Sequence, residues 1–205
     1  MLFSNVTLET LIAGVVALLV GLTFHEFSHA LVADNLGDHR PRAMGRLTLN
    51  PIAHIDPLGA LMLIVAGFGW AKPVMVNLGA LRGGRQSMAL VAFAGPIANV
   101  VVAIGFAVVF RVLDLAGADS GFLVRLVGLI VQLNILLAIF NLIPIPPLDG
   151  YNVLLAYLPP RQAMVIQQYA PYGVIALLLL IILPGSPLRA LLGLSGPITR
   201  VLIGA

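Results

Sequence analysis

The chain has 205 residues, of which 60% are hydrophobic and only 9% are charged, and its formal net charge is +3. So little polar surface excludes a soluble domain of this size and indicates a protein of the lipid bilayer. No cysteine is present, which excludes disulfides and thiolate ligands for a metal. The basic residues are scattered singly, without interleaved aromatic residues, so we expect no nucleic-acid partner.

Hydrophobic runs bounded by glycine, proline and charged residues predict the helices in the first half of the chain. The first runs from about residue 7 to 36, and because its start lacks the basic residues of a cleavable signal peptide, we expect it to be retained. Residues 58–68 are too few to cross a bilayer and predict a half-span or re-entrant helix. Alternating apolar residues at 46–50 and 70–77 predict two strands near the membrane surface, to which an unwound substrate could pair.

The second half of the chain is dominated by long apolar runs at residues 87–115 and 121–142. The second run ends at a proline-rich stretch, which must break the helix because proline lacks an N–H group. A short helix, a last span and an amphipathic tail follow, at residues 150–158, 163–183 and 187–203. We therefore expect an all-α polytopic membrane protein with about 4–6 transmembrane or re-entrant helices and a small membrane-associated β-sheet, forming a single intramembrane domain over residues 1–205.

Basic residues are concentrated between the first span and the next strong span, and the following loop has few. Loops rich in lysine and arginine stay on the cytoplasmic side, so the end of the first helix should face the cytoplasm. The basic residues of this segment are Arg40, Arg42, Arg46, Lys72, Arg82 and Arg85.

The first predicted helix contains His25-Glu26-Phe27-Ser28-His29, an HExxH motif. Residues four apart share a helical face, so the two imidazoles can point at one ion while Glu26 flanks it. Zn²⁺ lowers the pKa of bound water to about 7, and an adjacent carboxylate takes its proton. The alternatives are a chance pattern or hydrogen bonding between helices. Because a charge inside a membrane helix costs about 2.5 to 3.5 kcal/mol, such residues usually mark function.

Two histidines leave a tetrahedral ion short of one protein ligand. Six of the eight acidic residues lie near span ends or in loops, which leaves Glu26 and Asp149 in apolar surroundings. Asp149 follows the proline break, where a non-helical backbone can aim a carboxylate inward and Gly150 permits a tight turn. Its alternative role is the N-cap of the following helix.

With these residues in hand, the sequence resembles the site-2 protease family of intramembrane zinc metalloproteases. HEFSH matches the family's HExxH, and residues 141–150 match its second motif, an Asn and Pro followed by Leu-Asp-Gly. Residues 45–54, 69–74 and 94–99 look like the compact branch, without a PDZ or CBS domain. The resemblance implies one Zn²⁺ bound by His25, His29 and Asp149, with Glu26 as general base, and proteolysis of membrane-anchored proteins.

Two further residues are candidates for the catalytic machinery. His54 could bind substrate or donate to the developing oxyanion, or it could be a structural histidine of the loop. Asn141 could orient the substrate or the oxyanion, or it could make a hydrogen bond between spans. Asn99 and Asn134 have the same ambiguity, with the structural role favoured.

Two other functions compete with proteolysis. In a metal transporter or channel, the same histidines and carboxylates would line an ion path. In a catalytically inactive membrane binding module, the motifs would be present without catalysing a reaction. The expected setting is a bacterial or archaeal cell membrane, with a membrane-anchored protein as substrate and a separate membrane protein as regulator.

Overall fold

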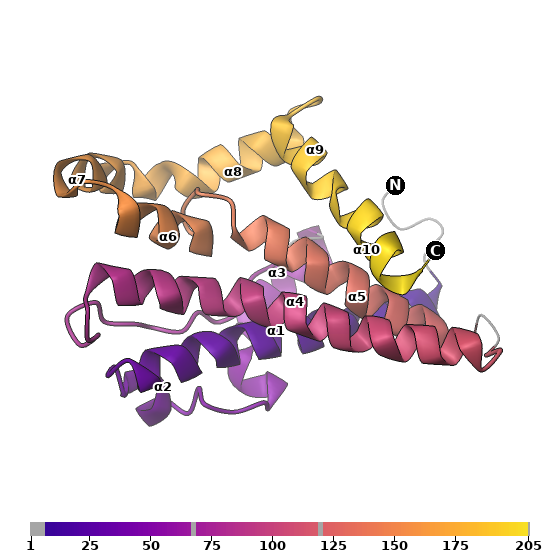
Figure 1. Ribbon diagram of the computed structural model, residues 1–205. Coiled ribbons are helices and arrows are strands. Elements are labelled where there is room, and N and C mark those ends of the chain that lie inside the picture. The colour runs from indigo at the N-terminus through magenta and orange to yellow at the C-terminus, as the bar shows by residue number, and fades with distance from the viewer. Residues whose placement is uncertain (1–6, 67–68, 119–120, 205) are drawn as a thin grey trace.

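The computed structural model describes residues 7–66, 69–118 and 121–204, and almost every element in them is helical. Figure 1 shows the elements as an elongated bundle. The helices, in chain order, are α1 (Leu8–Asn35), α2 (Arg40–Ala43), η1 (Pro51–His54), α3 (Pro57–Ala66), α4 (Arg85–Leu115), α5 (Phe122–Asn141), α6 (Asp149–Tyr157), α7 (Pro160–Gln168), η2 (Ala170–Tyr172), α8 (Gly173–Ile182), α9 (Pro187–Gly193) and α10 (Ser195–Ile203).

Three long helices, α1, α4 and α5, pack against one another and form the centre of the molecule. Their contacts are rich in small residues, and Ala17 of α1 and Ala103 of α4 are completely buried. Small side chains let helix backbones approach closely, which is how membrane helices gain packing contacts. The predicted spans at residues 7–36, 87–115 and 121–142 are confirmed to within two residues at each end.

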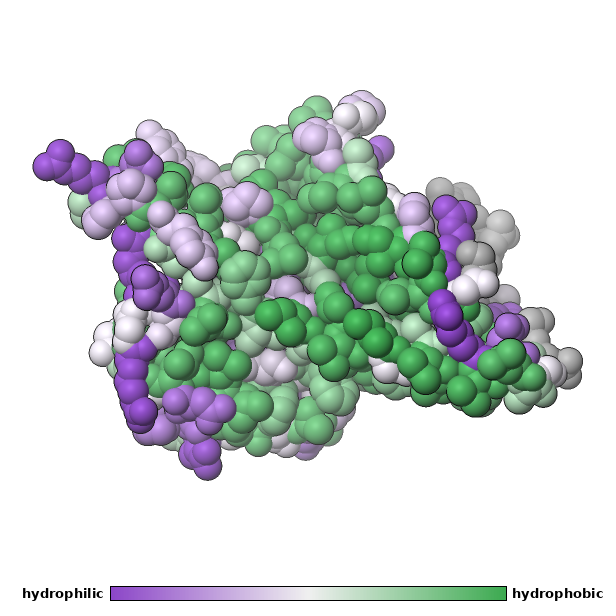
Figure 2. Space-filling view, in the orientation of Figure 1, coloured by the Kyte–Doolittle hydropathy of each residue, from purple (hydrophilic) through white to green (hydrophobic). Residues whose placement is uncertain are grey.

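These three helices are each long and apolar enough to cross a membrane. Apolar side chains cover the middle of the face seen in Figure 2, and hydrophilic ones gather toward its two ends. That distribution fits a hydrocarbon layer around the middle of the bundle. The chain is a multi-pass membrane protein.

The last predicted span, at residues 163–183, is not one continuous helix. It is divided into α7, η2 and α8. The direction of the chain bends by 46° between α7 and the following arm, which consists of η2 and α8. Pro171 lies at the break, and its missing N–H group prevents the helix from continuing straight. The bent pair would make a fourth span if both arms cross together.

The predicted small β-sheet is wrong for the part of the chain that the structure describes. There, pairing is limited to an isolated antiparallel bridge between Ile55 and Ala71. In residues 46–50, the N–H of Asn50 binds the Thr48 hydroxyl instead of a neighbouring strand. In residues 70–77, Pro73 has no N–H, and other N–H groups donate to side chains of the first helix and the loop after it. Such local side-chain bonds compete with a strand ladder.

Candidate active site

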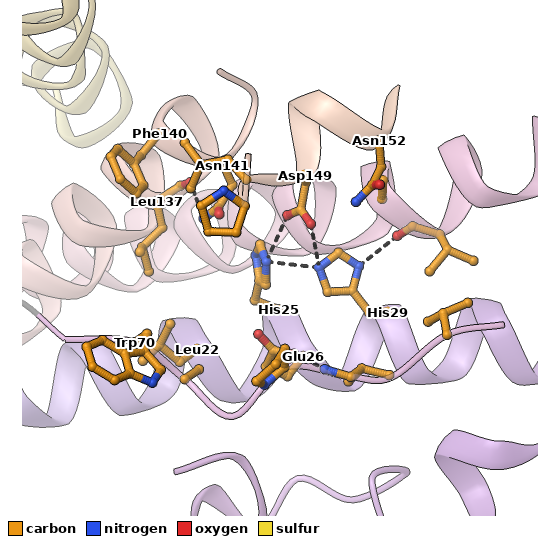
Figure 3. A pocket seen from close by; sticks show the side chains of 18 of the residues that line it. Leu22, His25, Glu26, His29, Trp70, Leu137, Phe140, Asn141, Asp149 and Asn152 are labelled. Atoms are coloured by element: carbon orange, nitrogen blue, oxygen red, sulfur yellow. Dashed lines mark hydrogen bonds and ion pairs between the residues drawn. The ribbon is translucent and has the colours of Figure 1, made fainter. Parts of the chain in front are cut away.

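His25 and His29 lie one turn apart on the same face of α1, and both are buried, with exposed fractions of 5% and 7%. Their Nε2 atoms are 3.0 Å apart, and the ring planes are nearly perpendicular, at 86°. Figure 3 shows both rings directed from α1 toward the helix that bears Asp149. The helical spacing of the motif therefore brings the two imidazoles to one point inside the bundle.

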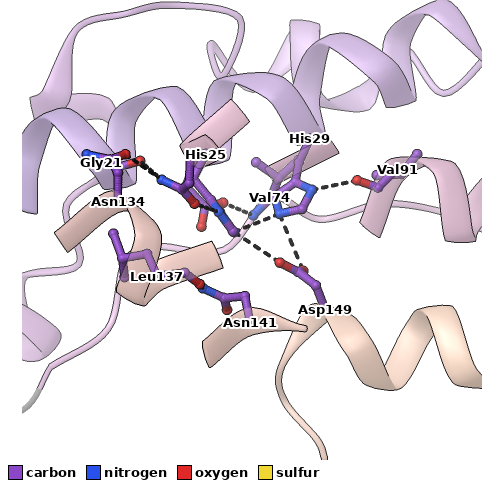
Figure 4. A network of polar contacts seen from close by, with 11 residues as sticks. Gly21, His25, His29, Val74, Val91, Asn134, Leu137, Asn141 and Asp149 are labelled. Atoms are coloured by element: carbon purple, nitrogen blue, oxygen red, sulfur yellow. Dashed lines mark hydrogen bonds and ion pairs between the residues drawn. The ribbon is translucent and has the colours of Figure 1, made fainter. Parts of the chain in front are cut away.

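The other nitrogen of each imidazole is held by an acceptor on α4 (Figure 4). His25 Nδ1 donates to the Asn99 side-chain oxygen at 2.7 Å, and His29 Nδ1 donates to the Val91 carbonyl at 2.7 Å. The Asn99 amide is oriented by its own donor, which binds the carbonyl of Gly21 at 3.0 Å. The two acceptor atoms are oxygens without a hydrogen, so each Nδ1 carries the hydrogen, and in the neutral imidazole each Nε2 then presents a lone pair.

Asp149 is the first residue of α6, with Leu148 at the N-cap, so its carboxylate is free of the capping role. The carboxylate faces the two imidazoles, with Oδ2 3.1 Å from His25 Nε2 and Oδ1 3.4 Å from His29 Nε2. The turn before it is tight, because a Cβ on Gly150 would collide with the carbonyl of Leu142. The proline break thus ends α5 and allows α6 to begin where the Asp149 carboxylate reaches the two imidazoles of α1.

This donor set has the chemistry of a cation site. Two imidazole lone pairs and one carboxylate converge, with ligand atoms all within 4.8 Å of one another. Around a tetrahedral zinc ion with bonds of about 2.0 to 2.2 Å, neighbouring ligand atoms are roughly 3.3 Å apart. The separations of 3.0, 3.1 and 3.4 Å are close to that value. Three facing acceptors without a shared cation would repel one another, so the residues fit Zn²⁺.

Gly95 on α4 lies directly against the two imidazoles. A Cβ at this position would lie 2.5 Å from His29 Nε2 and 2.6 Å from His25 Nε2. No real Cβ atom approaches a neighbour so closely, so only glycine lets α4 pack directly against the imidazoles.

Glu26 lies beside the histidines on α1 and is 8% exposed. Its Oε2 accepts a hydrogen bond of 3.2 Å from the N–H of Val74. Together with the histidines and Asp149, it lines a cavity of about 410 Å³ whose walls also include Trp70 and Asn141. The cavity offers room for a peptide segment next to the three converging groups.

The two remaining candidates lie in different places. Asn141, at the end of α5, lines the same cavity, and its amide nitrogen donates to the Leu137 carbonyl at 3.0 Å. Among the described residues no hydrogen bond to its side-chain oxygen is formed, so that oxygen can accept one from a ligand. His54 does not line this cavity. It is 2% exposed, donates from Nε2 to the Thr48 carbonyl at 2.8 Å, and borders a neighbouring cavity of about 240 Å³.

Sequence reasoning favoured a structural role for Asn99, which makes hydrogen bonds between the central helices, but it missed several groups that position the site. The groups it missed are the Val91 carbonyl, Gly95 and the N–H of Val74. Gly95 and Asn99 stand four residues apart in an apolar run, so they share one helical face, and this pattern was the available signal. The two backbone groups leave no mark in the sequence.

Charged groups of the loop after α1 hold the segment that reaches Glu26. Asp38 is 1% exposed and binds the Arg40 guanidinium and, through Oδ2, the N–H of Asn77 at 2.6 Å. The hydrogen bond from Arg40 holds the pKa of Asp38 at about 2, below its ordinary value, against the opposing effect of burial. Asp38 thereby fixes the end of the segment that carries Val74.

Comparisons with known proteins give a consistent result. The model of peptidase family M50 matches residues 112–183, which include Asn141 and Asp149. YwhC of Bacillus subtilis is 41% identical over 175 residues, covering 83% of this chain and 80% of YwhC. Rip2 of Mycobacterium tuberculosis strain H37Rv is 33% identical, covering 81% of this chain and 65% of Rip2.

A relative from Methanocaldococcus jannaschii is 28% identical and covers 74% of each chain. All three relatives are named as zinc metalloproteases. No solved structure matches the chain.

Proposed function

The chain belongs to peptidase family M50, the site-2 protease family of zinc metalloproteases, and from this premise we propose that it is an intramembrane endopeptidase. It hydrolyses peptide bonds within or next to the transmembrane segments of membrane-anchored proteins, as in regulated intramembrane proteolysis. The observation that carries the proposal is the convergence of His25, His29 and Asp149 inside an apolar helical bundle. Intramembrane ionisable residues are costly and usually functional.

The three converging residues are the proposed zinc ligands. A zinc ion held by these residues would lower the pKa of a bound water to about 7 and would polarise the substrate carbonyl. Asn99 and the Val91 carbonyl orient the imidazoles through their Nδ1 atoms, so that both Nε2 lone pairs stay directed at the ion.

Glu26 is the proposed general base. Its carboxylate takes a proton from the attacking water and delivers that proton to the amine that leaves. In the structure, Glu26 Oε2 accepts the N–H of Val74, which holds the carboxylate beside the cavity. Asn141 is proposed to bind the substrate from the same cavity, and His54 remains a proposal with a structural alternative.

The basic end of the bundle supports an orientation in which the active site is reached from the cytoplasm. Because the chain has no cysteine, a single introduced cysteine can report on which side of the membrane its loop lies. In intact cells, an impermeant thiol reagent should label Ala116→Cys in the loop after α4 and leave Arg82→Cys unlabelled. The opposite labelling pattern would show that the chain has the reverse orientation in the membrane.

Cleavage of a membrane-tethered reporter by the purified chain in lipid is the direct test. The parent should bind one zinc ion and cut the reporter. Glu26→Gln should keep the zinc and lose at least a thousandfold in kcat, whereas Asp149→Ala should lose both zinc and cleavage. Glu9→Gln changes an exposed acid at the far end of α1 and should match the parent. A Glu26→Gln protein that cleaves like the parent would refute the proposal.

A further inference from the structure

A second cavity, of about 430 Å³, adjoins the proposed catalytic cavity. It lies between the start of α4 and the helices α6 and α7, and we name it the α6–α7 cavity. The two cavities share Met88 and Asn152 in their walls. A polypeptide in the catalytic cavity can therefore continue into the second one past these two side chains.

Asn152 is placed to contact such a polypeptide. It follows Asp149 by three residues on α6, so the two side chains share one face of the helix. Figure 3 shows Asn152 on the same helix as Asp149, among the side chains that line the catalytic cavity. Within the described ranges, the hydrogen bonds of the protein do not engage its amide. A side-chain amide has both donor and acceptor, which match the C=O and N–H groups of a peptide backbone.

The walls of the α6–α7 cavity indicate what kind of side chain it would hold. Leu155, Met88 and Met164 provide apolar surface, and methionine adapts to ligands of different shape. Arg85 is fixed at its edge, because Nη2 donates to the Leu158 carbonyl at 3.1 Å. The cavity thus combines an apolar interior with a polar rim.

The position of this cavity also fits a polypeptide that leaves the membrane. It lies between α7 and the start of α4, at the end of the bundle that bears α2 (Figure 1). Hydrophilic side chains gather at the same end in Figure 2. An extended peptide there can satisfy its remaining backbone groups with water, which the hydrocarbon layer does not provide.

We propose that the α6–α7 cavity is a substrate subsite. It takes an apolar side chain of about leucine or methionine size on one side of the scissile bond, while the Asn152 amide pairs with the substrate backbone. This inference rests on the proposed endopeptidase function. Asn152 is then a positioning residue for the substrate, and Ala156, which also lines the cavity, is a determinant of side-chain size.

The role of Asn152 is tested by removing its amide at nearly constant volume. Asn152→Leu should raise KM about tenfold with little change in kcat and with full zinc content, because it removes contacts made equally before and during reaction. Gln168→Leu removes an exposed amide of α7 that lines neither cavity and should match the parent. A reporter with an ester in place of the contacted N–H should lose affinity for the parent but not for Asn152→Leu. An unchanged KM in Asn152→Leu would overturn the role of Asn152.

The subsite itself is tested by filling it. The panel consists of reporters with either leucine or alanine at each position beside the cleaved bond. At one of these positions, the ratio of kcat/KM for the leucine reporter to that for the alanine reporter should be about tenfold lower in Ala156→Phe than in the parent. Preferences identical to those of the parent would overturn the subsite. Binding of the same reporters to Glu26→Gln, with and without Ala156→Phe, separates the two proposals. A parent that binds with this preference but never cleaves refutes the endopeptidase function and leaves the subsite standing.

Discussion

The side-chain oxygen of Asn99 on α4 accepts a hydrogen bond of 2.7 Å from His25 Nδ1 on α1, across 74 positions of the chain. Asn99 is completely buried, and its amide nitrogen binds both the Gly21 carbonyl and Asn134. One asparagine therefore joins all three central helices and also sets which nitrogen of His25 faces Asp149. Partners of this kind orient metal-binding histidines and raise their basicity.

Replacing Asn99 should weaken the metal site. Asn99→Leu leaves His25 Nδ1 without an acceptor, so we expect zinc affinity to fall about 10- to 100-fold. Competition with a chromogenic chelator measures the affinity. Asn134→Leu removes a bond to Asn99 without touching His25 and should have a smaller effect. Equal affinities for Asn99→Leu and the parent would show that His25 needs no such partner.

Gly95 should be intolerant of even one added methyl group. Gly95→Ala puts a Cβ against both imidazoles, so zinc binding should be lost or reduced by more than a hundredfold while the helices remain folded. Gly105→Ala on the same helix is the matched control, because nothing lies within 4 Å of its Cβ. Zinc content by elemental analysis, with circular dichroism, distinguishes the two. Parent-like zinc content in Gly95→Ala would mean that α4 can move aside.

The Asp38 carboxylate should make stability depend on acidity. Its pKa is held at about 2 in the folded chain, against an ordinary value of 3.8. A depressed pKa stabilises the fold above the ordinary value, and that contribution is lost as the pH falls through about 2. At pH 5 the free energy of unfolding of the parent should exceed that of Asp38→Asn by about 1 to 2 kcal/mol, after allowance for the half-exposed Arg40.

Unfolding in detergent between pH 5 and 2 measures this difference, which should shrink steadily toward the acid end. Asp114→Asn is the control, because within the described residues Asp114 makes no ion pair. A difference that stays constant over this range would rule out the contribution of Asp38.

Substitutions of His54 should distinguish a structural role of this residue from a catalytic one. His54→Leu leaves the Thr48 carbonyl without its donor, which should cost about 1 to 3 kcal/mol of unfolding free energy. If the role is structural, kcat per zinc-loaded molecule stays near that of the parent, and His54→Gln, which retains a donor, recovers part of the stability. A large loss of kcat in a stable His54→Leu protein would instead support the role in substrate or oxyanion binding.

Local pattern was sufficient to predict much of this molecule. Helix length and position follow from the apolar runs, because a bilayer requires about 20 apolar residues in a helix whatever its neighbours are. The strands at residues 46–50 and 70–77 were predicted wrongly for a related reason. A strand needs a partner, and here Glu26 and Asp38 take the N–H groups that a partner would have used.

What the sequence by itself determined is the set of reactive groups and their local spacing: two imidazoles on one helical face, a carboxylate next to them, and a second carboxylate after a proline break. What only the tertiary structure decided is how these groups are held. The Val91 carbonyl and the Val74 N–H are backbone groups, which nearly every residue has, so no pattern of residue types predicts their roles. The fit of Gly95 against the imidazoles likewise depends on the approach of α4 to α1, which is a property of packing between segments far apart in the chain.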